Sequence, residues 1–202
     1  MARLPLTKEE VVPAKVVLKF ERIGLSEEQF FQLCCDNRDF RMELTARKEL
    51  IIMSPVGLKS GYRENVLSTE LTIWARKDGT GIVCSASTAY TLPNGAIRCP
   101  DASWIRRIRL DAFDKQELEK FGHICPDFVA EVMSPSDTLA ELQDKMDEYI
   151  ANGAQLGWLI DPYDARAFVY RPGKVVECFE NPTTISGDPV LPGFVFNVAE
   201  IW

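Results

Sequence analysis

The sequence predicts an α/β (α+β) domain in which helices flank a mixed central sheet. Short apolar runs of strand length recur along the chain and are separated by turn residues. Two longer segments, 59–77 and 138–152, instead have apolar residues at helical spacing. The second of these lies between two strand-like runs, and a strand–helix–strand unit normally forms a parallel crossover. Because a hairpin elsewhere predicts antiparallel pairs, the sheet is expected to be mixed.

One domain is expected over residues 25–202, preceded by an N-terminal arm and an edge strand within residues 1–24. The length of 202 residues fits a single hydrophobic core. Ser26-Glu-Glu-Gln29 has the form of a capping box, which predicts a helix that begins at this point. The next two apolar runs are joined by a short polar turn, so they predict a hairpin with strands over 40–44 and 49–53.

The middle and the C-terminal part of the chain show the same alternation. Gly79 ends the helix over 59–77. Pro93-Asn94-Gly95 then separates two further strand-like runs, 82–92 and 98–105. The remaining predicted elements are a charged helix or loop over 111–121, a strand over 127–133, a helix over 138–152, and strands over 156–160, 167–170 and 175–179.

The overall composition is that of an ordinary globular protein, with 46% hydrophobic and 26% charged residues. The net charge of −7 argues against a chain that coats nucleic acid through a broad basic surface. It leaves room for a local cationic groove, or for a metal site with acidic ligands. Because the sequence has no signal peptide and no long apolar run, we expect a cytoplasmic protein without a membrane partner.

Histidine and cysteine chemistry has little support in this sequence. The six cysteines have neither a CxxC pair nor the spacing of a zinc site. His123 is the only histidine, which nearly removes histidine metal sites and Ser/His or Cys/His catalysis. The remaining candidates for chemistry are carboxylates and lysine.

Two carboxylates stand out because they lie on strand-like apolar runs. Asp101 follows Pro100 at the start of a strand, where it could also simply cap a turn. Glu131 is the one charge in an apolar strand, and an unpaired carboxylate is expensive to bury there. It needs a cation, a hydrogen-bond donor or a metal, and a structural salt bridge is the alternative to a functional role. If the two acids share a site, their repulsion should raise one pKa in the metal-free protein.

The helix after Glu131 carries the third candidate, Lys145. Thr138 and Glu141 have the spacing of a capping box, which fixes where this helix begins. Lys145 lies at the border of the apolar face, so its ammonium could reach back over the strand end or could be solvated. We expect truncation of Lys145 to cost little packing, and we expect the site to contain no other protein cation.

Three further acids are weaker candidates. Glu49 opens the apolar run of the second hairpin strand. Glu64 lies on the helix over 59–77, where its ordinary interpretation is a solvated charge. Asp127 precedes the strand of Glu131 and could instead cap the start of that strand.

These residues resemble the Uma-two family of restriction-endonuclease-like proteins, which belongs to the PD-(D/E)XK nuclease superfamily. The resemblance implies a restriction-endonuclease-like core in which Asp101 and Glu131 are catalytic acids and ligands of Mg²⁺ or Mn²⁺. The usual lysine of the superfamily would fall at Met133, and in this family it has moved to the helix, where Lys145 stands. The similar segments extend from about residue 25 to the C-terminus and are Met53-Ser54-Pro55, Pro100-Asp101-Ala-Ser-Trp104, Pro126-Asp127-Phe-Val-Ala-Glu131-Val-Met-Ser134-Pro-Ser136, the helix with Lys145 and Tyr149, Trp158-Leu-Ile-Asp161-Pro162, Leu191-Pro192-Gly193 and Phe194-Val-Phe196.

The leading functional hypothesis is a metal-dependent endonuclease that hydrolyses phosphodiester bonds of double-stranded DNA. In it, Lys145 would orient the attacking water or stabilise charge on the phosphate oxygens. The alternative is a catalytically silent nuclease-fold protein that acts as a nucleic-acid-binding or assembly module, and a hydrolase of another phosphate ester is a third class. By analogy with nucleases that pair two sites, we expect a homodimer, with the apolar segment 194–202 as a candidate interface.

Overall fold

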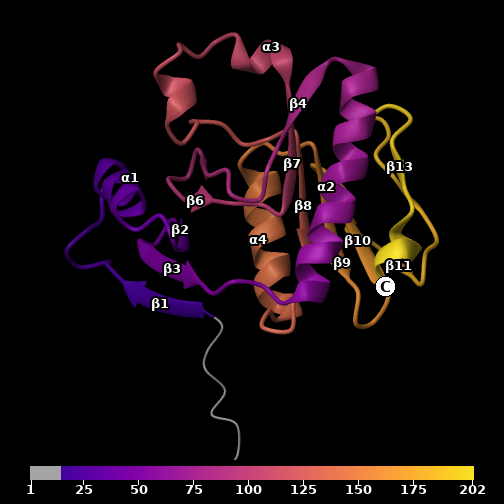
Figure 1. The fold of residues 1–202 in the computed structure, drawn as a ribbon, viewed down its shortest axis with the longest axis horizontal. Coiled ribbons are helices and arrows are strands. Elements are labelled where there is room, and N and C mark those ends of the chain that lie inside the picture. Colours follow the sequence, from indigo (N-terminus) through magenta and orange to yellow (C-terminus); the bar gives the residue numbers. More distant parts are fainter. Residues whose placement is uncertain (1–14) are drawn as a thin grey trace, which may run out of the picture.

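The computed structural model describes residues 15–202 and confirms the predicted α/β class (Figure 1). The arm expected before residue 15 lies outside the described residues. The helices are α1 (Glu27–Asp36), α2 (Leu58–Asp78), α3 (Arg107–Leu110) and α4 (Leu139–Ala151), with short 3₁₀ helices at Glu117–Glu119 and Val198–Ile201. The strands are β1 (Lys15–Lys19), β2 (Arg41–Leu44), β3 (Glu49–Met53), β4 (Gly81–Cys84), β5 (Tyr90–Thr91), β6 (Ile97–Arg98), β7 (Ala102–Arg106), β8 (Phe128–Val132), β9 (Leu156–Asp161), β10 (Arg166–Tyr170), β11 (Glu177–Glu180), β12 (Ile185–Ser186) and β13 (Val195–Phe196).

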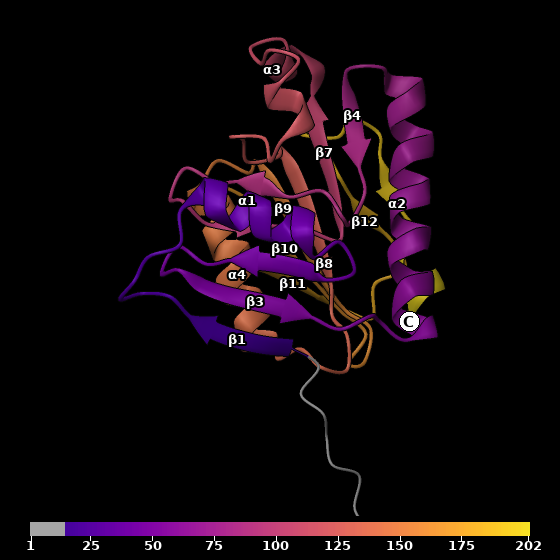
Figure 2. The same cartoon turned by 60° about the vertical axis from the view of Figure 1, so that its left-hand side comes forward.

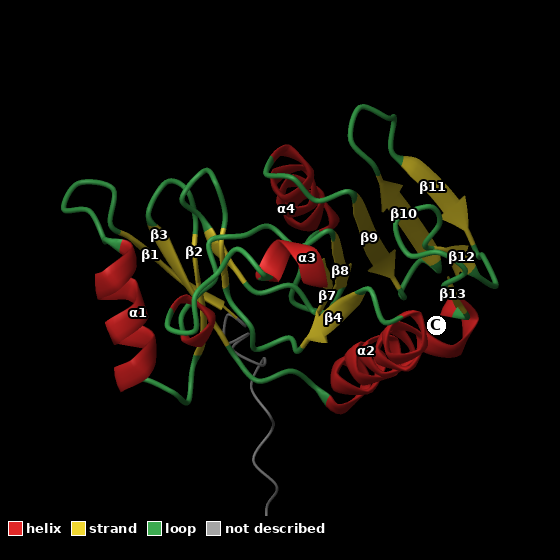
Figure 3. Ribbon diagram, turned by 90° about the horizontal axis from the view of Figure 1, so that it is seen from above, coloured by secondary structure: helices red, strands yellow, loops and turns green. Residues whose placement is uncertain are grey.

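The larger sheet has six strands in the order β11-β10-β9-β8-β7-β4 and is mixed, as predicted. Its parallel neighbours β8 and β9 are joined by α4, and the other pairs are antiparallel. Helices α2 and α4 lie on opposite sides of this sheet (Figure 3). Leu71 of α2 packs in one core cluster with Phe128 of β8, whereas Met146 of α4 packs in another with Val129. Because side chains alternate along a strand, Glu131 faces α4, as Val129 does.

The smaller sheet has five strands in the order β1-β3-β2-β6-β5 and lies beside the larger one (Figure 2). Met42 and Leu44 of β2 pack with Phe30 of α1 in a third core cluster. Alternation along β2 therefore directs Arg41 and Glu43 to the other side of the sheet, which is the side of α4. Arg41 and Glu43 of β2 and Glu131 of β8 thus lie on the sides of their sheets that face α4.

The capping signals read from the sequence are present at two helix starts. Before α1, Ser26 Oγ accepts from the Gln29 N–H at 3.2 Å, and Gln29 Oε1 accepts from the Ser26 N–H at 2.9 Å. Before α4, Thr138 Oγ1 accepts from the Glu141 N–H at 3.3 Å. These bonds satisfy N–H groups that have no partner within the helix, so both helices begin where the sequence predicts.

Two predicted strands are each divided between the two sheets. The run over 82–92 forms β4 in the larger sheet and β5 in the smaller one, and the run over 98–105 forms β6 and β7. Pro100 has no N–H to donate, so it interrupts the ladder between β6 and β7. Asp101 therefore lies where the chain crosses from one sheet to the other, one residue before β7.

The C-terminal segment, a candidate interface because it is apolar, has most of its apolar side chains inside the protein. Phe194, Phe196, Val198 and Ile201 are each at most 3% exposed and belong to the core cluster that contains α2. The rings of Trp158 and Phe194 stack with their centroids 5.6 Å apart. This segment closes the hydrophobic core of its own chain.

All six cysteines are free thiols, and Cys99 and Cys125 are buried in apolar clusters, as expected for small apolar side chains. The predicted helix or loop over 111–121 is mostly irregular, with one 3₁₀ turn. No helix described for residues 15–202 combines the length and the apolar character that crossing a membrane requires.

Candidate active site

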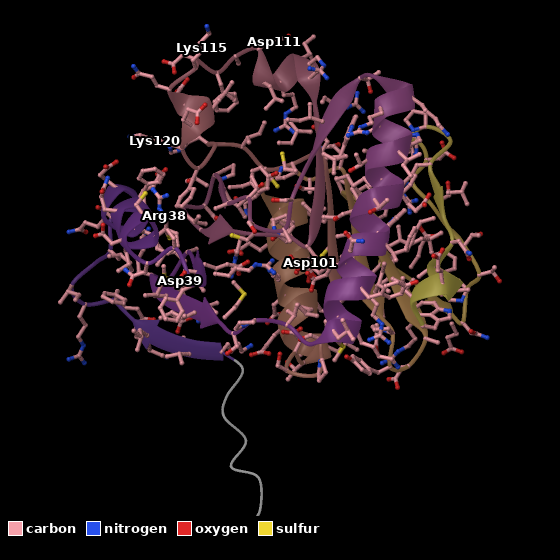
Figure 4. The ribbon with its side chains drawn as sticks, viewed as in Figure 1. Arg38, Asp39, Asp101, Asp111, Lys115 and Lys120 are labelled. Carbon is pink, nitrogen blue, oxygen red and sulfur yellow. The ribbon has the colours of Figure 1, made fainter. Side chains whose placement is uncertain are left out.

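A pocket of about 1030 Å³ lies between the two sheets and α4 and contains most of the acids singled out in the sequence. Asp101 lies near the centre of the molecule, beside α2 (Figure 4). The charged side chains that line the pocket include Arg41, Glu43, Glu49, Glu64, Arg98, Asp101, Glu131, Lys145 and Glu148. Residues from β2, β6, β8, α2 and α4 therefore meet in one cavity.

The Asp101 carboxylate is 10% exposed and is held from two sides. Its Oδ1 accepts from an Arg41 Nη at 3.1 Å, and its Oδ2 accepts from the Val132 N–H at 2.9 Å. The second bond joins Asp101 to the residue that follows Glu131 in β8. Asp101 is thus fixed beside the end of β8.

Glu131 is buried, and one of its oxygens takes two donors from α4. Glu131 Oε1 lies 2.9 Å from Lys145 Nζ and accepts from the Tyr149 hydroxyl at 3.1 Å. Burial, with help from the Asp101 and Glu43 charges and against the pull of Lys145, raises the pKa of Glu131 to about 8. The expected rise of one acid's pKa is therefore present. Lys145 and the other donors around Glu131 do not offset the cost of burying its carboxylate.

Lys145 lies between two carboxylates. Its Nζ is 2.9 Å from Glu131 Oε1 and 2.9 Å from Glu43 Oε1, and its side chain is 13% exposed. Burial lowers the pKa of Lys145, but the Glu131 and Glu43 charges outweigh burial and raise it above its ordinary value. The ammonium is therefore charged at neutral pH and is aimed at the acids of the pocket.

Glu43 is a member of the site that the sequence reasoning missed. Besides Lys145, it accepts from an Arg98 Nη at 3.1 Å and from the Cys99 N–H at 2.9 Å. Against the cost of burial, Lys145 and Arg98 hold the pKa of Glu43 down at about 2. The sequence held only a weak indication of this role. Glu43 is a lone acid between the apolar residues Met42 and Leu44, and such alternation usually places the acid on the solvent-exposed face of a strand.

The expectation that Lys145 would be the site's only cation is wrong. Arg41 bonds Asp101, and Arg98 bridges Glu43 to Glu148, with its Nε 2.6 Å from Glu148 Oε2. Both arginines come from the smaller sheet. Their approach depends on how that sheet packs against the larger one, so local sequence patterns do not reveal it.

The three weaker candidates have different positions. Glu49 lines the pocket and pairs with Lys19 at 3.3 Å. Glu64 of α2 also lines it, and burial together with the Asp101 charge raises its pKa to about 7. Asp127 does not line the pocket, because it precedes β8, at the end of the strand opposite to Glu131. It binds Arg109 at 3.0 Å and the Arg106 N–H at 2.9 Å.

Asp101 and Glu131 are the two acids of the pocket that could hold a hydrated hard cation. Within residues 15–202 there is no group of three or more His, Cys, Asp or Glu side chains arranged to hold a metal. Mg²⁺ commonly uses only one or two carboxylates and completes its shell with water and substrate phosphate. Glu131 Oε2 receives none of the hydrogen bonds described for these residues, and a further cation beside it would offset the burial and the neighbouring negative charges that raise the pKa of Glu131.

The same fold occurs in a known protein structure. A crystal structure of a putative nuclease of the DUF820 group from Anabaena variabilis superposes with a TM-score of 0.67 at 20% identity, covering 79% of this chain and 88% of that chain. The Uma2 family model, described as "Putative restriction endonuclease", matches residues 27–199, so the chain belongs to this family. The resemblance seen in the sequence is thus confirmed. No curated protein matches the chain.

Proposed function

We propose that this protein is a metal-dependent endonuclease that hydrolyses DNA phosphodiester bonds. The observation that carries the proposal is the meeting of Asp101, Glu131 and Lys145 in one pocket, with Lys145 Nζ 2.9 Å from Glu131 Oε1. Membership of a family described as "Putative restriction endonuclease" supports a nucleic-acid substrate.

Asp101 and Glu131 would hold Mg²⁺ or Mn²⁺ through their carboxylate oxygens. When bound, such an ion lowers the pKa of its water and polarises the scissile phosphate. The chain supplies the preorganisation for this chemistry. The Val132 N–H and Arg41 hold the Asp101 carboxylate in place, while Tyr149 and Lys145 hold one oxygen of Glu131.

Lys145 would act on the substrate rather than on the metal. Its ammonium is charged, nearly buried and adjacent to a proposed ligand, so it can stabilise negative charge that develops on phosphate oxygens. At a side chain that is only 13% exposed, such a fixed charge acts more strongly than in water and needs little reorganisation during the reaction.

The substrate would be duplex DNA cut by a homodimer. Acidic side chains outnumber basic ones around the pocket, and the chain's net charge is −7. Affinity for a polyanion would therefore depend on the bound cation and on a few local contacts rather than on a broad basic surface. Two-fold pairing of sites would allow both strands to be cut, and sedimentation at micromolar concentration tests it.

Plasmid nicking and cleavage of a labelled duplex test the activity. Purified protein is incubated with Mg²⁺, Mn²⁺ or EDTA, and Asp101→Asn is compared with the parent. Asp127→Asn is the matched control, because Asp127 is also a buried aspartate held by arginine but lies outside the pocket. We expect metal-dependent cleavage by the parent and by Asp127→Asn, and a loss of roughly a hundredfold or more in Asp101→Asn. DNA binding without cleavage under every metal condition would contradict the proposal and favour the silent nucleic-acid-binding module.

A further inference from the structure

A continuous chain of buried ion pairs connects the candidate site to the smaller sheet. It begins at Glu131 and passes through Lys145, Glu43 and Arg98 to Glu148, so acidic and basic side chains alternate. The four contacts, in this order, measure 2.9, 2.9, 3.1 and 2.6 Å. Within this series of contacts, Lys145 is the cation that binds Glu131, and Glu43 is the second carboxylate that binds Lys145.

A lysine in this position needs more than one anchor. Its four-carbon stem is flexible and its ammonium is a point charge without the fixed fork of arginine. A single acceptor would leave the ammonium free to rotate about that contact. Two carboxylate oxygens at 2.9 Å, approaching from β8 and from β2, restrict Nζ to one place.

The two carboxylates that bind Lys145 differ in their other partners. Glu131 also accepts from Tyr149 and is a proposed metal ligand, so its charge would be shared. Glu43 is 3% exposed at its side chain and is already fixed by Arg98 and the Cys99 N–H, so its geometry does not depend on Glu131. The Glu43 charge therefore stays directed at Lys145 whether or not Glu131 has another partner.

We propose that Glu43 is a positioning residue that holds the Lys145 ammonium in its working position, a role that rests on the proposed nuclease function. Glu43 itself touches neither Asp101 nor Glu131 in the contacts described for residues 15–202, so it acts through Lys145. A purely structural role, as a link between the two sheets, is the competing explanation.

Glu148 separates these two explanations. It is the other carboxylate bound to Arg98, belongs to the same chain of ion pairs and also bonds Asn94, at 2.9 Å. It has no contact with Lys145 among the salt bridges described. Glu148→Gln therefore removes a carboxylate from the same link between the sheets and leaves both anchors of Lys145 in place.

The experiment compares Glu43→Gln with Glu148→Gln in two measurements. In steady-state cleavage of a labelled duplex, Glu43→Gln should lower kcat by roughly ten- to a hundredfold, the loss typical of removing a group that orients an active-site residue, with KM nearly unchanged. Glu148→Gln should retain kcat within about threefold, because Arg98 keeps its contact with Glu43 and both carboxylates that bind Lys145 remain. In metal-free protein, the Lys145 ammonium should give a distinct ¹⁵Nζ NMR signal in the parent and in Glu148→Gln. Glu43→Gln should lose this signal by exchange or mobility.

Equal losses of kcat in the two variants, or an unchanged Lys145 signal in Glu43→Gln, would overturn the positioning role. If Glu43→Gln does not fold, Glu43→Asp replaces it, since this variant keeps the negative charge but withdraws the carboxylate by one methylene from its 2.9 Å contact with Lys145. A parent that does not cleave DNA would contradict the proposed function alone, because the NMR comparison still decides whether Glu43 anchors Lys145.

Discussion

Strand β8 has a buried acid at each end, and the two acids have opposite surroundings. Asp127, before the strand, is 4% exposed and receives Arg109, Arg106 and a backbone N–H. Glu131, near the other end, is 3% exposed, yet burial and neighbouring acids raise its pKa to about 8 despite Lys145. A buried acid saturated by cations is a structural ion pair, whereas an incompletely compensated one in a pocket is a candidate for chemistry.

The largest effect should come from removing the Lys145 charge. Lys145→Met keeps much of the side-chain volume but leaves no ammonium for the substrate phosphate, so cleavage should fall by roughly two to three orders of magnitude. The control is Lys19→Met, since Lys19 is an exposed lysine whose partner is Glu49. Parental cleavage by Lys145→Met, measured on a labelled duplex, would show that the lysine is only part of the fold.

Truncation of Lys145 is expected to cost little packing, but the same variant should lose stability through its charge. Removing the ammonium takes away one of the two cations that bind the ionised Glu43 carboxylate, and breaking a buried ion pair typically costs about 3–5 kcal/mol. Urea unfolding at pH 7 should show a lower free energy of unfolding for Lys145→Met, while Lys19→Met should change it by less than about 1 kcal/mol.

A divalent cation should raise the stability of the folded protein by binding near Asp101 and Glu131, and Asp127 should not contribute to this effect. A ligand that binds only the folded state at a concentration of about 100 times its Kd adds about 2.7 kcal/mol to the free energy of unfolding. Mn²⁺ should therefore raise the Tm of the parent and of Asp127→Asn but leave Asp101→Asn nearly unchanged. Equal Mn²⁺ shifts in the three proteins, measured by calorimetry, would exclude Asp101 as a ligand.

The raised pKa of Glu131 predicts a pH dependence of stability in the metal-free protein. Between the ordinary value of 4.5 and about 8, the folded state keeps a proton at Glu131 that the unfolded state loses. This group's contribution to stability therefore falls as pH rises through that range. Glu131→Gln, which stays uncharged, should have a flatter profile and a relative gain in stability above pH 8. An identical slope for parent and variant in urea titrations from pH 5 to 9 would refute this.

The smallest effect on cleavage is expected from Asp127→Asn. This change weakens the contacts to Arg106 and Arg109 without touching the pocket. Cleavage per folded molecule should stay within about twofold of the parent, because no group near Asp101 or Glu131 moves, while stability should fall by about 1–3 kcal/mol as for a buried acceptor lost from its donors. A loss of cleavage as large as that of Asp101→Asn would remove the distinction between the two ends of β8.

Local patterns in the sequence were sufficient for the mixed α/β class, for most helix and strand positions, and for the two helix caps. They also pointed to Asp101, Glu131 and Lys145, because a charge in an apolar strand or at the edge of an apolar helix face is visible within a few residues. Hydrophobic periodicity and capping depend on neighbours three or four positions away, so they can be read from one segment alone.

Only the tertiary structure decided that Arg41, Glu43 and Arg98 join the pocket and that Asp127 does not. Arg41 and Glu43 are far in sequence from Asp101 and Glu131, and they approach because β2 turns its polar face toward α4. Two apolar runs were likewise divided between sheets where Pro100 and a turn interrupt the ladder. The sequence by itself thus determined which residues could carry charge into the interior. The packing of one sheet against the other determined which charges are compensated, because ion pairing in a buried site depends on distances between segments that local patterns do not encode.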